Sequence, residues 1–194
     1  MIVTKLPAGN LMAIQAEGQG HRPAGLHVSQ IIKSLMVGIK PKQYGEPTTK
    51  QEVEAKETKI QFGLGFEQAL EAAFQSGSPG SFRPPPVFVP PGIWCSPDSV
   101  DPSIWAVEEF KLTWYSAKKE VPYDEVYWPW LVQIKAYCKA LDTLLAKLTV
   151  LHVNGDYSPP RPWPPQSYGL TFHEMEIEEN WGMLVSQAKS QAWL

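Results

Sequence analysis

A glutamate and a lysine two residues apart, Glu109 and Lys111, are the pair whose types and spacing could most readily do chemistry. They lie in WAVEEFKLTW (105–114), a segment whose alternating β-branched and aromatic residues predict a β-strand. Side chains on a strand point alternately to its two faces, so Glu109 and Lys111 share one face. A carboxylate can hold a divalent cation, and an ammonium group beside it can bind a phosphate or orient a water. The alternative is a solvent-exposed ion pair on an edge strand, which contributes little to stability.

The same segment carries a second glutamate, Glu108, which alternation places on the face opposite Lys111. That opposite face otherwise presents Ala106, Phe110 and Leu112, and we expect it to pack against a core. Glu108 is therefore not expected to act together with Lys111.

Asp98 is the carboxylate that the preceding chain could bring beside Glu109. Residues 93–95 are predicted to form a short strand, which the following Ser-Pro-Asp step ends. An antiparallel hairpin between this strand and residues 105–114 would place Asp98 near the face that carries Glu109. The alternative is that Asp98 caps the turn, the usual role of Asp beside Pro and Ser. Asp101 falls in the turn before the longer strand, and we do not expect it in the site.

Three further candidates lie on predicted helices. Glu67 stands at the edge of the apolar stripe of a helix predicted over residues 60–74, where it could face a site or be solvated. Gln133 and Tyr137 lie four residues apart on a helix predicted over residues 130–148, so they share a face. They could support a site or make hydrogen bonds at the edge of the core.

The rest of the pattern favours an α/β fold within one domain that spans residues 1–194. We expect residues 1–25 to be irregular and residues 77–91, with their runs of proline, to form a loop. Helices are predicted over 26–37, with Ser29 as cap, and over 174–192. Strands are predicted over 148–154 and 168–172.

Composition indicates a globular chain rather than a disordered one. Hydrophobic residues make up 43% of its 194 residues and charged residues 19%. The net charge of −3 is not that of a protein that coats nucleic acid by charge alone, although a metal-dependent nuclease remains compatible with it. No apolar run is long enough for a secretory signal or a membrane span, so we expect a cytoplasmic protein without membrane contact. Its two cysteines, Cys95 and Cys138, should be reduced.

Four segments, taken in order, resemble the motifs of the PD-(D/E)XK nuclease superfamily, in its RecB-like branch of phage and prokaryotic exonucleases. The segments are GLGFEQALE (63–71), SPDSVD (96–101), EFKLTW (109–114) and QIKAY (133–137). The pattern of the branch is a helix with Glu, a Pro-Asp step, a Glu-x-Lys strand and a helix with Gln and Tyr four residues apart. Each motif alone is weakly specific, and their order on the predicted elements strengthens the match. The resemblance covers about residues 60–137, and it implies a restriction-endonuclease-like core with a central mixed sheet flanked by helices.

Hydrolysis of a DNA phosphodiester is the activity that the resemblance implies. Carboxylates that hold Mg²⁺ or Mn²⁺ neutralise the phosphate and lower the pKa of a bound water. Asp98 and Glu109 are the best ligands, and Glu67 would complete the set directly or through water. The resemblance adds the backbone carbonyl of Phe110. Lys111 would orient the attacking water and stabilise the transition state.

Gln133 and Tyr137 would support the site or contact DNA, because in the resembled branch they lie beside it. Related CRISPR-associated exonucleases hold an iron–sulfur cluster with four cysteines, which this chain lacks, so no cluster is expected.

DNA is the expected partner, and the resemblance adds a homo-oligomer and a phage single-strand annealing protein. The scattered basic residues Arg22, Arg83, Lys118, Lys119 and Lys135 could form a local DNA-binding patch, although no dense basic run exists. We predict an exonuclease of phage or prophage DNA recombination, replication or repair. The alternatives are a nuclease fold that has lost turnover and serves as a DNA-binding or protein-adaptor module, and a phage structural or assembly protein.

Overall fold

The computed structural model describes residues 1–6, 23–47, 49–55, 57–58, 61, 65, 80–116, 127–153 and 166–194. Its central element is a mixed sheet in which the strands follow the order β1-β8-β7-β6-β5. The bounds of these strands, across the sheet, are Ile2–Leu6, Gln166–Thr171, Leu145–His152, Ala106–Thr113 and Ser99–Asp101. β6 and β7 are parallel, and the other neighbouring strands are antiparallel.

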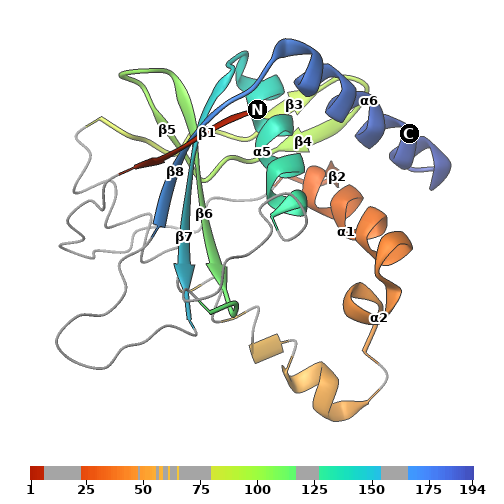
Figure 1. Cartoon of the computed structure of the whole chain (residues 1–194). Coiled ribbons are helices and arrows are strands. Elements are labelled where there is room, and N and C mark those ends of the chain that lie inside the picture. Colours follow the sequence, from red (N-terminus) through yellow and green to blue (C-terminus); the bar gives the residue numbers. More distant parts are fainter. Residues whose placement is uncertain are drawn as a thin grey trace, which may run out of the picture.

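Helices cover one face of this sheet (Figure 1). The chain passes from β6 to the parallel β7 through α5 (Trp128–Leu141), because parallel strands need a crossover connection. α5 contacts β6 and β7, and it packs against α1 (Val28–Ile39) and α6 (Glu174–Ser190). The short helix α2 (Pro41–Tyr44) follows α1 and contacts it. The predicted α/β class, a central mixed sheet flanked by helices, is confirmed.

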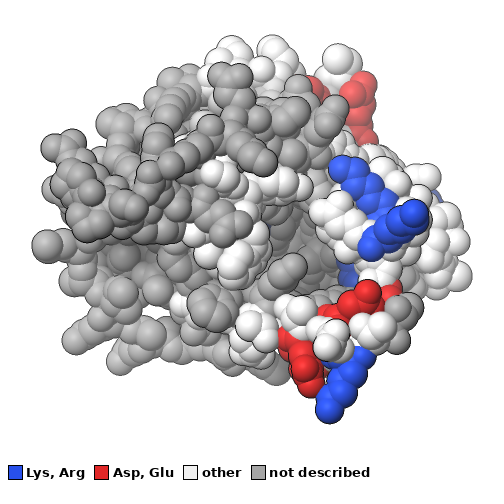
Figure 2. Space-filling model, turned by 60° about the horizontal axis from the view of Figure 1, so that its bottom comes forward, with Lys and Arg blue, Asp and Glu red and all other residues white. Residues whose placement is uncertain are grey.

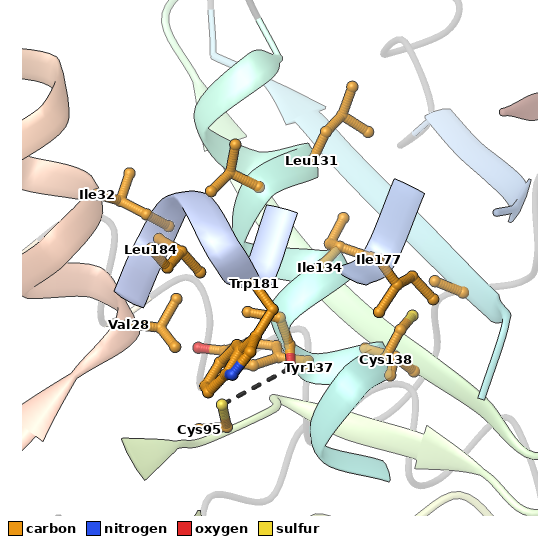
Figure 3. Packing of buried hydrophobic residues seen from close by; sticks show 14 of the residues in the cluster. Val28, Ile32, Cys95, Leu131, Ile134, Tyr137, Cys138, Ile177, Trp181 and Leu184 are labelled. Carbon is orange, nitrogen blue, oxygen red and sulfur yellow. Dashed lines mark hydrogen bonds between the residues drawn. The ribbon is translucent and has the colours of Figure 1, made fainter. Parts of the chain in front are cut away.

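The hydrophobic core fills the space between these helices and the sheet (Figure 3). Side chains from all three long helices point toward one another there; examples are Val28, Ile32, Ile134, Cys138, Ile177, Trp181 and Leu184. From β6 the core takes Val107, which lies on the same face as Glu109 and Lys111. The expectation that the Phe110 face packs against a core is confirmed, since Ala106 and Phe110 are each 1% exposed. Neither residue belongs to the cluster between the helices and the sheet, because β6 is an interior strand and both of its faces are covered.

A second, three-stranded sheet has the order β2-β4-β3, with bounds Leu26–His27, Ile93–Cys95 and Val87–Val89. The strand predicted over residues 93–95 is thus present, but it does not pair with β6. Instead β5 forms the antiparallel hairpin with β6, with Ser99 opposite Glu108. Pro97, which has no backbone N–H for a sheet ladder, separates β4 from β5.

Other boundaries also differ from the sequence prediction. The N-terminal segment includes β1, which pairs with β8, so it is not irregular throughout. α1 begins at Val28, and the side chain of Gln30 accepts a hydrogen bond from His27 N–H, so Ser29 is not the cap. α5 ends at Leu141 because Asp142 adopts a left-handed conformation with φ 51°, and β7 begins well before the predicted residue 148.

Among the described helices, none combines the length and the apolar composition needed to cross a bilayer. The helix predicted over residues 60–74 lies almost wholly outside the described residues.

Candidate active site

Glu109 and Lys111 lie on the interior strand β6, not on an edge strand. The Glu109 side chain is 0% exposed, and Lys111 Nζ donates a hydrogen bond to its Oε1 at 2.5 Å. An exposed surface ion pair is therefore excluded. A buried carboxylate needs a compensating charge or donor, and the Lys111 ammonium supplies one.

Asp98 lies directly against the middle of β6. Phe110 N–H donates a hydrogen bond to Asp98 Oδ2 at 3.0 Å. The hairpin partner β5 begins at Ser99, which pairs with Glu108. Asp98 comes just before β5, so it lies next to β6 beyond the last backbone pair of the hairpin. The N–H and C=O of one strand residue point to the same side, so the Phe110 carbonyl also points toward the side of Asp98. The strand that pairs was mispredicted, yet Asp98 and β6 lie side by side as expected.

α5 adds the third part of the site through Tyr137. Its hydroxyl accepts a hydrogen bond from Gln133 Nε2 at 2.7 Å, as their spacing on one face of the helix predicted. Burial raises the pKa of Tyr137 well above its ordinary value, and the negative charges of Glu109 and Asp98 raise it further, while the bond from Gln133 lowers it. The Tyr137 hydroxyl therefore stays protonated at neutral pH.

Ser96, two residues before Asp98, was not singled out in the sequence. Its Oγ is buried and has no hydrogen-bond partner among the described groups. Buried hydroxyls usually have such a partner, so Ser96 is a further candidate for the site.

The two residues set aside in the sequence, Glu108 and Asp101, belong to a different cluster. Lys147 of β7 donates to Asp101 Oδ2 at 2.5 Å and to Glu108 Oε1 at 3.4 Å, and Ser99 Oγ donates to Glu108 Oε2 at 3.0 Å. By alternation Glu108 lies on the face of β6 opposite Glu109. This geometry agrees with the expectation that neither Glu108 nor Asp101 acts together with Lys111, although Asp101 is the last residue of β5 and not part of the turn.

Two of the five basic residues named in the sequence, Arg83 and Lys135, are among the described residues, so the predicted patch as a whole stays a prediction. Lys135 Nζ lies 5.6 Å from the centre of the Phe172 ring, and Arg83 is exposed in the segment before β3. On the face seen in Figure 2, basic and acidic side chains of the described residues are interspersed. Arg22, Lys118 and Lys119 lie outside the described residues, as does Glu67.

The donor set fits a hard divalent cation. Asp98, Glu109 and the Phe110 carbonyl offer oxygen atoms only, and Mg²⁺ prefers oxygen ligands and keeps several waters, so few protein ligands suffice. Within the described ranges there is no group of three Asp, Glu, His or Cys side chains that could hold a metal ion by themselves. Glu67, the proposed further ligand, falls outside those ranges. The two buried thiols are poor ligands, because burial raises the pKa of Cys95 and of Cys138 to about 12.

Two solved exonuclease structures have a fold similar to that of this chain. An alkaline exonuclease from Laribacter hongkongensis superposes with a TM-score of 0.52 at 11% identity, over 86% of this chain and 87% of that one. A phage-related exonuclease from Haemophilus somnus superposes with a TM-score of 0.50 at 14% identity, over 86% of this chain and 92% of that one. No protein-family model and no curated protein sequence matches this chain. At these identities the likeness is one of fold, and this chain has the fold of the exonuclease structures.

Proposed function

We propose that this protein is a metal-dependent deoxyribonuclease, acting as an exonuclease on linear DNA. The observations that carry the proposal are the hydrogen bond from Phe110 N–H to Asp98 Oδ2 and the Glu109–Lys111 ion pair, because together they bring Asp98 beside the stretch of β6 that carries Glu109 and Lys111. Two carboxylates and an ammonium group beside a backbone carbonyl are the groups that phosphodiester hydrolysis needs. The likeness in fold to two exonucleases supports the same reaction class.

Each residue has a role that its position supports. Asp98, Glu109 and the Phe110 carbonyl would hold Mg²⁺ or Mn²⁺, with Glu67 as a further ligand. Once bound, the ion would neutralise phosphate charge and lower the pKa of a water. Lys111, charged and already paired with Glu109, would bind a phosphate oxygen or orient the attacking water.

Tyr137 and Gln133 would position the acidic groups rather than react themselves. The phenol is buried and stays protonated, so its hydroxyl can donate a hydrogen bond toward the carboxylates that raise its pKa. Such support keeps a carboxylate in one orientation, which lowers the cost of assembling the site during the reaction.

The test uses end-labelled linear DNA and covalently closed circular DNA, each with Mg²⁺, with Mn²⁺ and with a chelator. We expect linear DNA to be degraded only when a metal ion is present, and closed circles to persist. Cutting of circles would change the proposal to an endonuclease. Folded protein that degrades neither substrate with either metal would overturn the proposal in favour of a DNA-binding or adaptor module.

Two variants accompany the wild-type protein in this assay. Lys111→Ala should lower the rate of degradation by about 10²- to 10³-fold, because it removes the charge beside Glu109. Lys139→Ala is the matched control, since Lys139 also forms a 2.5 Å ion pair with a glutamate, Glu178, but on the exposed surface between α5 and α6. Its degradation rate should equal that of the wild-type protein. A role in phage recombination, a homo-oligomer and an annealing partner stay predictions.

A further inference from the structure

One side of the segment that leads from β4 to Asp98 is more accessible than the other. Burial alternates along residues 93–99: the odd-numbered residues are buried, and the even-numbered ones, Trp94, Ser96 and Asp98, are partly exposed. Pro97 keeps the residue before it extended, so the alternation of β4 continues to Asp98. Trp94 therefore lies on the same side of this segment as Asp98, about 13 Å away along the chain at about 3.3 Å per residue.

The backbone of Trp94 is held on both sides, because β4 is the central strand of the β2-β4-β3 sheet. Trp94 pairs with His27 of β2 on one side and with Phe88 of β3 on the other. A residue in this position cannot shift without disturbing both pairings. The point from which the Trp94 ring projects is therefore fixed.

The indole ring of Trp94 is also held in place. The Phe88 ring contacts it, with the ring centroids 4.9 Å apart and the planes tilted by 58°. Gly25 approaches another part of the indole, where the Cβ of any other residue would lie 3.1 Å from Nε1. Gly25 has φ 128°, a conformation that residues with a Cβ rarely adopt, so this close approach depends on glycine. Phe88 and Gly25 together prevent the ring from turning aside.

The space between this ring and Asp98 is short. Ser96, with its small side chain, is the residue between them on the same side of the segment. A DNA strand that has its phosphodiester at Asp98 and runs along this side meets the Trp94 ring after about 13 Å. This is the length of a few nucleotides, at about 3.4 Å per nucleotide in a stacked strand. A free strand end fits within it, whereas a continuous strand has to displace the ring.

We propose that Trp94, held by Phe88 and Gly25, is an end stop: it blocks the path of the DNA strand beyond the candidate site. The site then accepts a free end and releases short products. This inference deepens the proposed exonuclease function and rests on it for the substrate. It also gives a structural reason for the persistence of closed circles, because a circle has no end to place in front of the ring.

The first test compares linear and circularised forms of one fluorescently labelled oligothymidylate, which share their length and base composition. All proteins carry Lys111→Ala, and Mg²⁺ is present, so that degradation is slow during the binding measurement. The Lys111→Ala protein should bind the linear form about 10-fold more tightly than the circle, because the circle alone has to displace the ring. Adding Trp94→Ala should remove this preference by strengthening binding of the circle. Trp94→Phe should keep part of the preference, since a smaller ring remains.

Trp128→Ala is the matched control. Trp128 is also a partly exposed tryptophan, but it lies at the start of α5 and lines the groove between α5 and α6. Its replacement should leave the preference for linear DNA unchanged. A merely structural role of Trp94 would weaken binding of both forms alike, so the ratio of the two affinities separates the two roles. Thermal melting of each variant verifies that it is folded.

The second test measures product length in proteins that retain Lys111. With Mg²⁺, the wild-type and Trp128→Ala proteins should release products of the same short length from linear single-stranded DNA. Trp94→Ala should release longer products, because the strand can then extend past Ser96. Denaturing electrophoresis resolves these lengths.

A folded Trp94→Ala protein that keeps either the preference for linear DNA or the wild-type product length would overturn the end stop. So would equal binding of the linear and circular forms by the Lys111→Ala protein, or binding of neither. If wild-type protein degrades no DNA while a preference for linear DNA still depends on Trp94, the nuclease proposal fails and the end stop stands. Degradation of linear DNA by wild-type protein without any Trp94-dependent preference gives the opposite result.

Discussion

Two clusters of acidic residues and lysine lie on opposite faces of β6, and they are built from similar parts. On one face Lys111 pairs with Glu109, and on the other Lys147 pairs with Glu108 and Asp101. In the second cluster the partners come from three adjacent strands, β5, β6 and β7, so the ion pairs link these strands across the sheet. In the first, both partners belong to β6 and link no strands.

This difference separates a structural role from a chemical one. In the Lys147 cluster, ion pairs that fix the register of three strands offset the desolvation cost of the buried charges. The Glu109–Lys111 ion pair itself joins no two strands, although Glu109 is the more deeply buried carboxylate, and the charge of Glu109 raises the pKa of Tyr137 on α5. Buried charges without an evident contribution to stability are typical of functional sites. The comparison predicts that mutations in the first cluster affect turnover and mutations in the second affect stability.

The largest effect is expected for Lys111→Ala. Loss of a charge placed for the transition state should lower the rate of DNA degradation by about 10²- to 10³-fold. Initial rates on end-labelled DNA at saturating Mg²⁺ measure this change, with circular dichroism to verify folding. A folded Lys111→Ala protein with at least half of the wild-type rate would contradict the chemical role of this cluster.

Asp98→Asn should lower the rate of degradation by about 10²-fold and raise the Mg²⁺ concentration needed for half-maximal rate. The fold should persist, because the amide oxygen can still accept the hydrogen bond from Phe110 N–H. The matched control is Asp142→Asn, since Asp142 is exposed and has φ 51°, a conformation that asparagine tolerates. Identical Mg²⁺ dependence of Asp98→Asn and wild-type protein would remove Asp98 from the set of ligands.

Lys147→Met should lower stability and leave the rate of DNA degradation unchanged. It leaves Glu108 and Asp101 without their shared donor, which should lower the free energy of unfolding by about 2 kcal/mol. Urea denaturation measures this loss, and the rate of DNA degradation per folded molecule should stay at the wild-type value. A large fall in that rate at unchanged stability would show that the two clusters are not separate in function.

The smallest effect concerns pH and Asp101. Burial by itself would raise the pKa of Asp101, but hydrogen bonds from Lys147 and Ser103 lower it below its ordinary value of 3.8. The folded state therefore favours the ionised carboxylate, and this contribution is fully present above about pH 4 and is lost as pH falls through the lower folded pKa. Asp101→Asn should be less stable than wild-type protein at pH 6, by about 1 kcal/mol, and the difference should shrink below pH 4. Denaturation midpoints across this range test it, and a difference that grows on acidification would contradict it.

The sequence predicted elements best where the signal is local. Alternation in residues 105–114 predicted β6, and helical spacing predicted that Gln133 and Tyr137 share a face. Alternation did not reveal which face of β6 meets the helices, because both faces of an interior strand are buried. Leu145 and Leu148 fit the apolar stripe of α5, yet they belong to β7, because the left-handed Asp142 ends the helix first.

The remaining errors arise from pairing between distant parts of the chain. β1 is a strand because it pairs with β8, and no local pattern in residues 1–25 predicted this pairing. For the same reason the hairpin partner of β6 was misassigned to residues 93–95. Asp98 lies beside β6 in either case, because it falls between the predicted strand and the observed one. The catalytic roles of these residues stay predictions until the variants are measured.

The connections around β6 also bear on the order in which the protein folds. The hydrogen bond from Phe110 to Asp98 closes only 12 residues of chain, whereas that from Lys147 to Glu108 joins residues 39 apart and needs the α5 crossover. Loop closure costs more entropy for the longer connection, so the hairpin between β5 and β6 can form before β7 pairs with β6 and the α5 crossover docks. During refolding Asp98 would then reach β6 before α5 brings in Tyr137, and under the proposed function the recovery of nuclease activity would follow the docking of α5 rather than the closing of the hairpin.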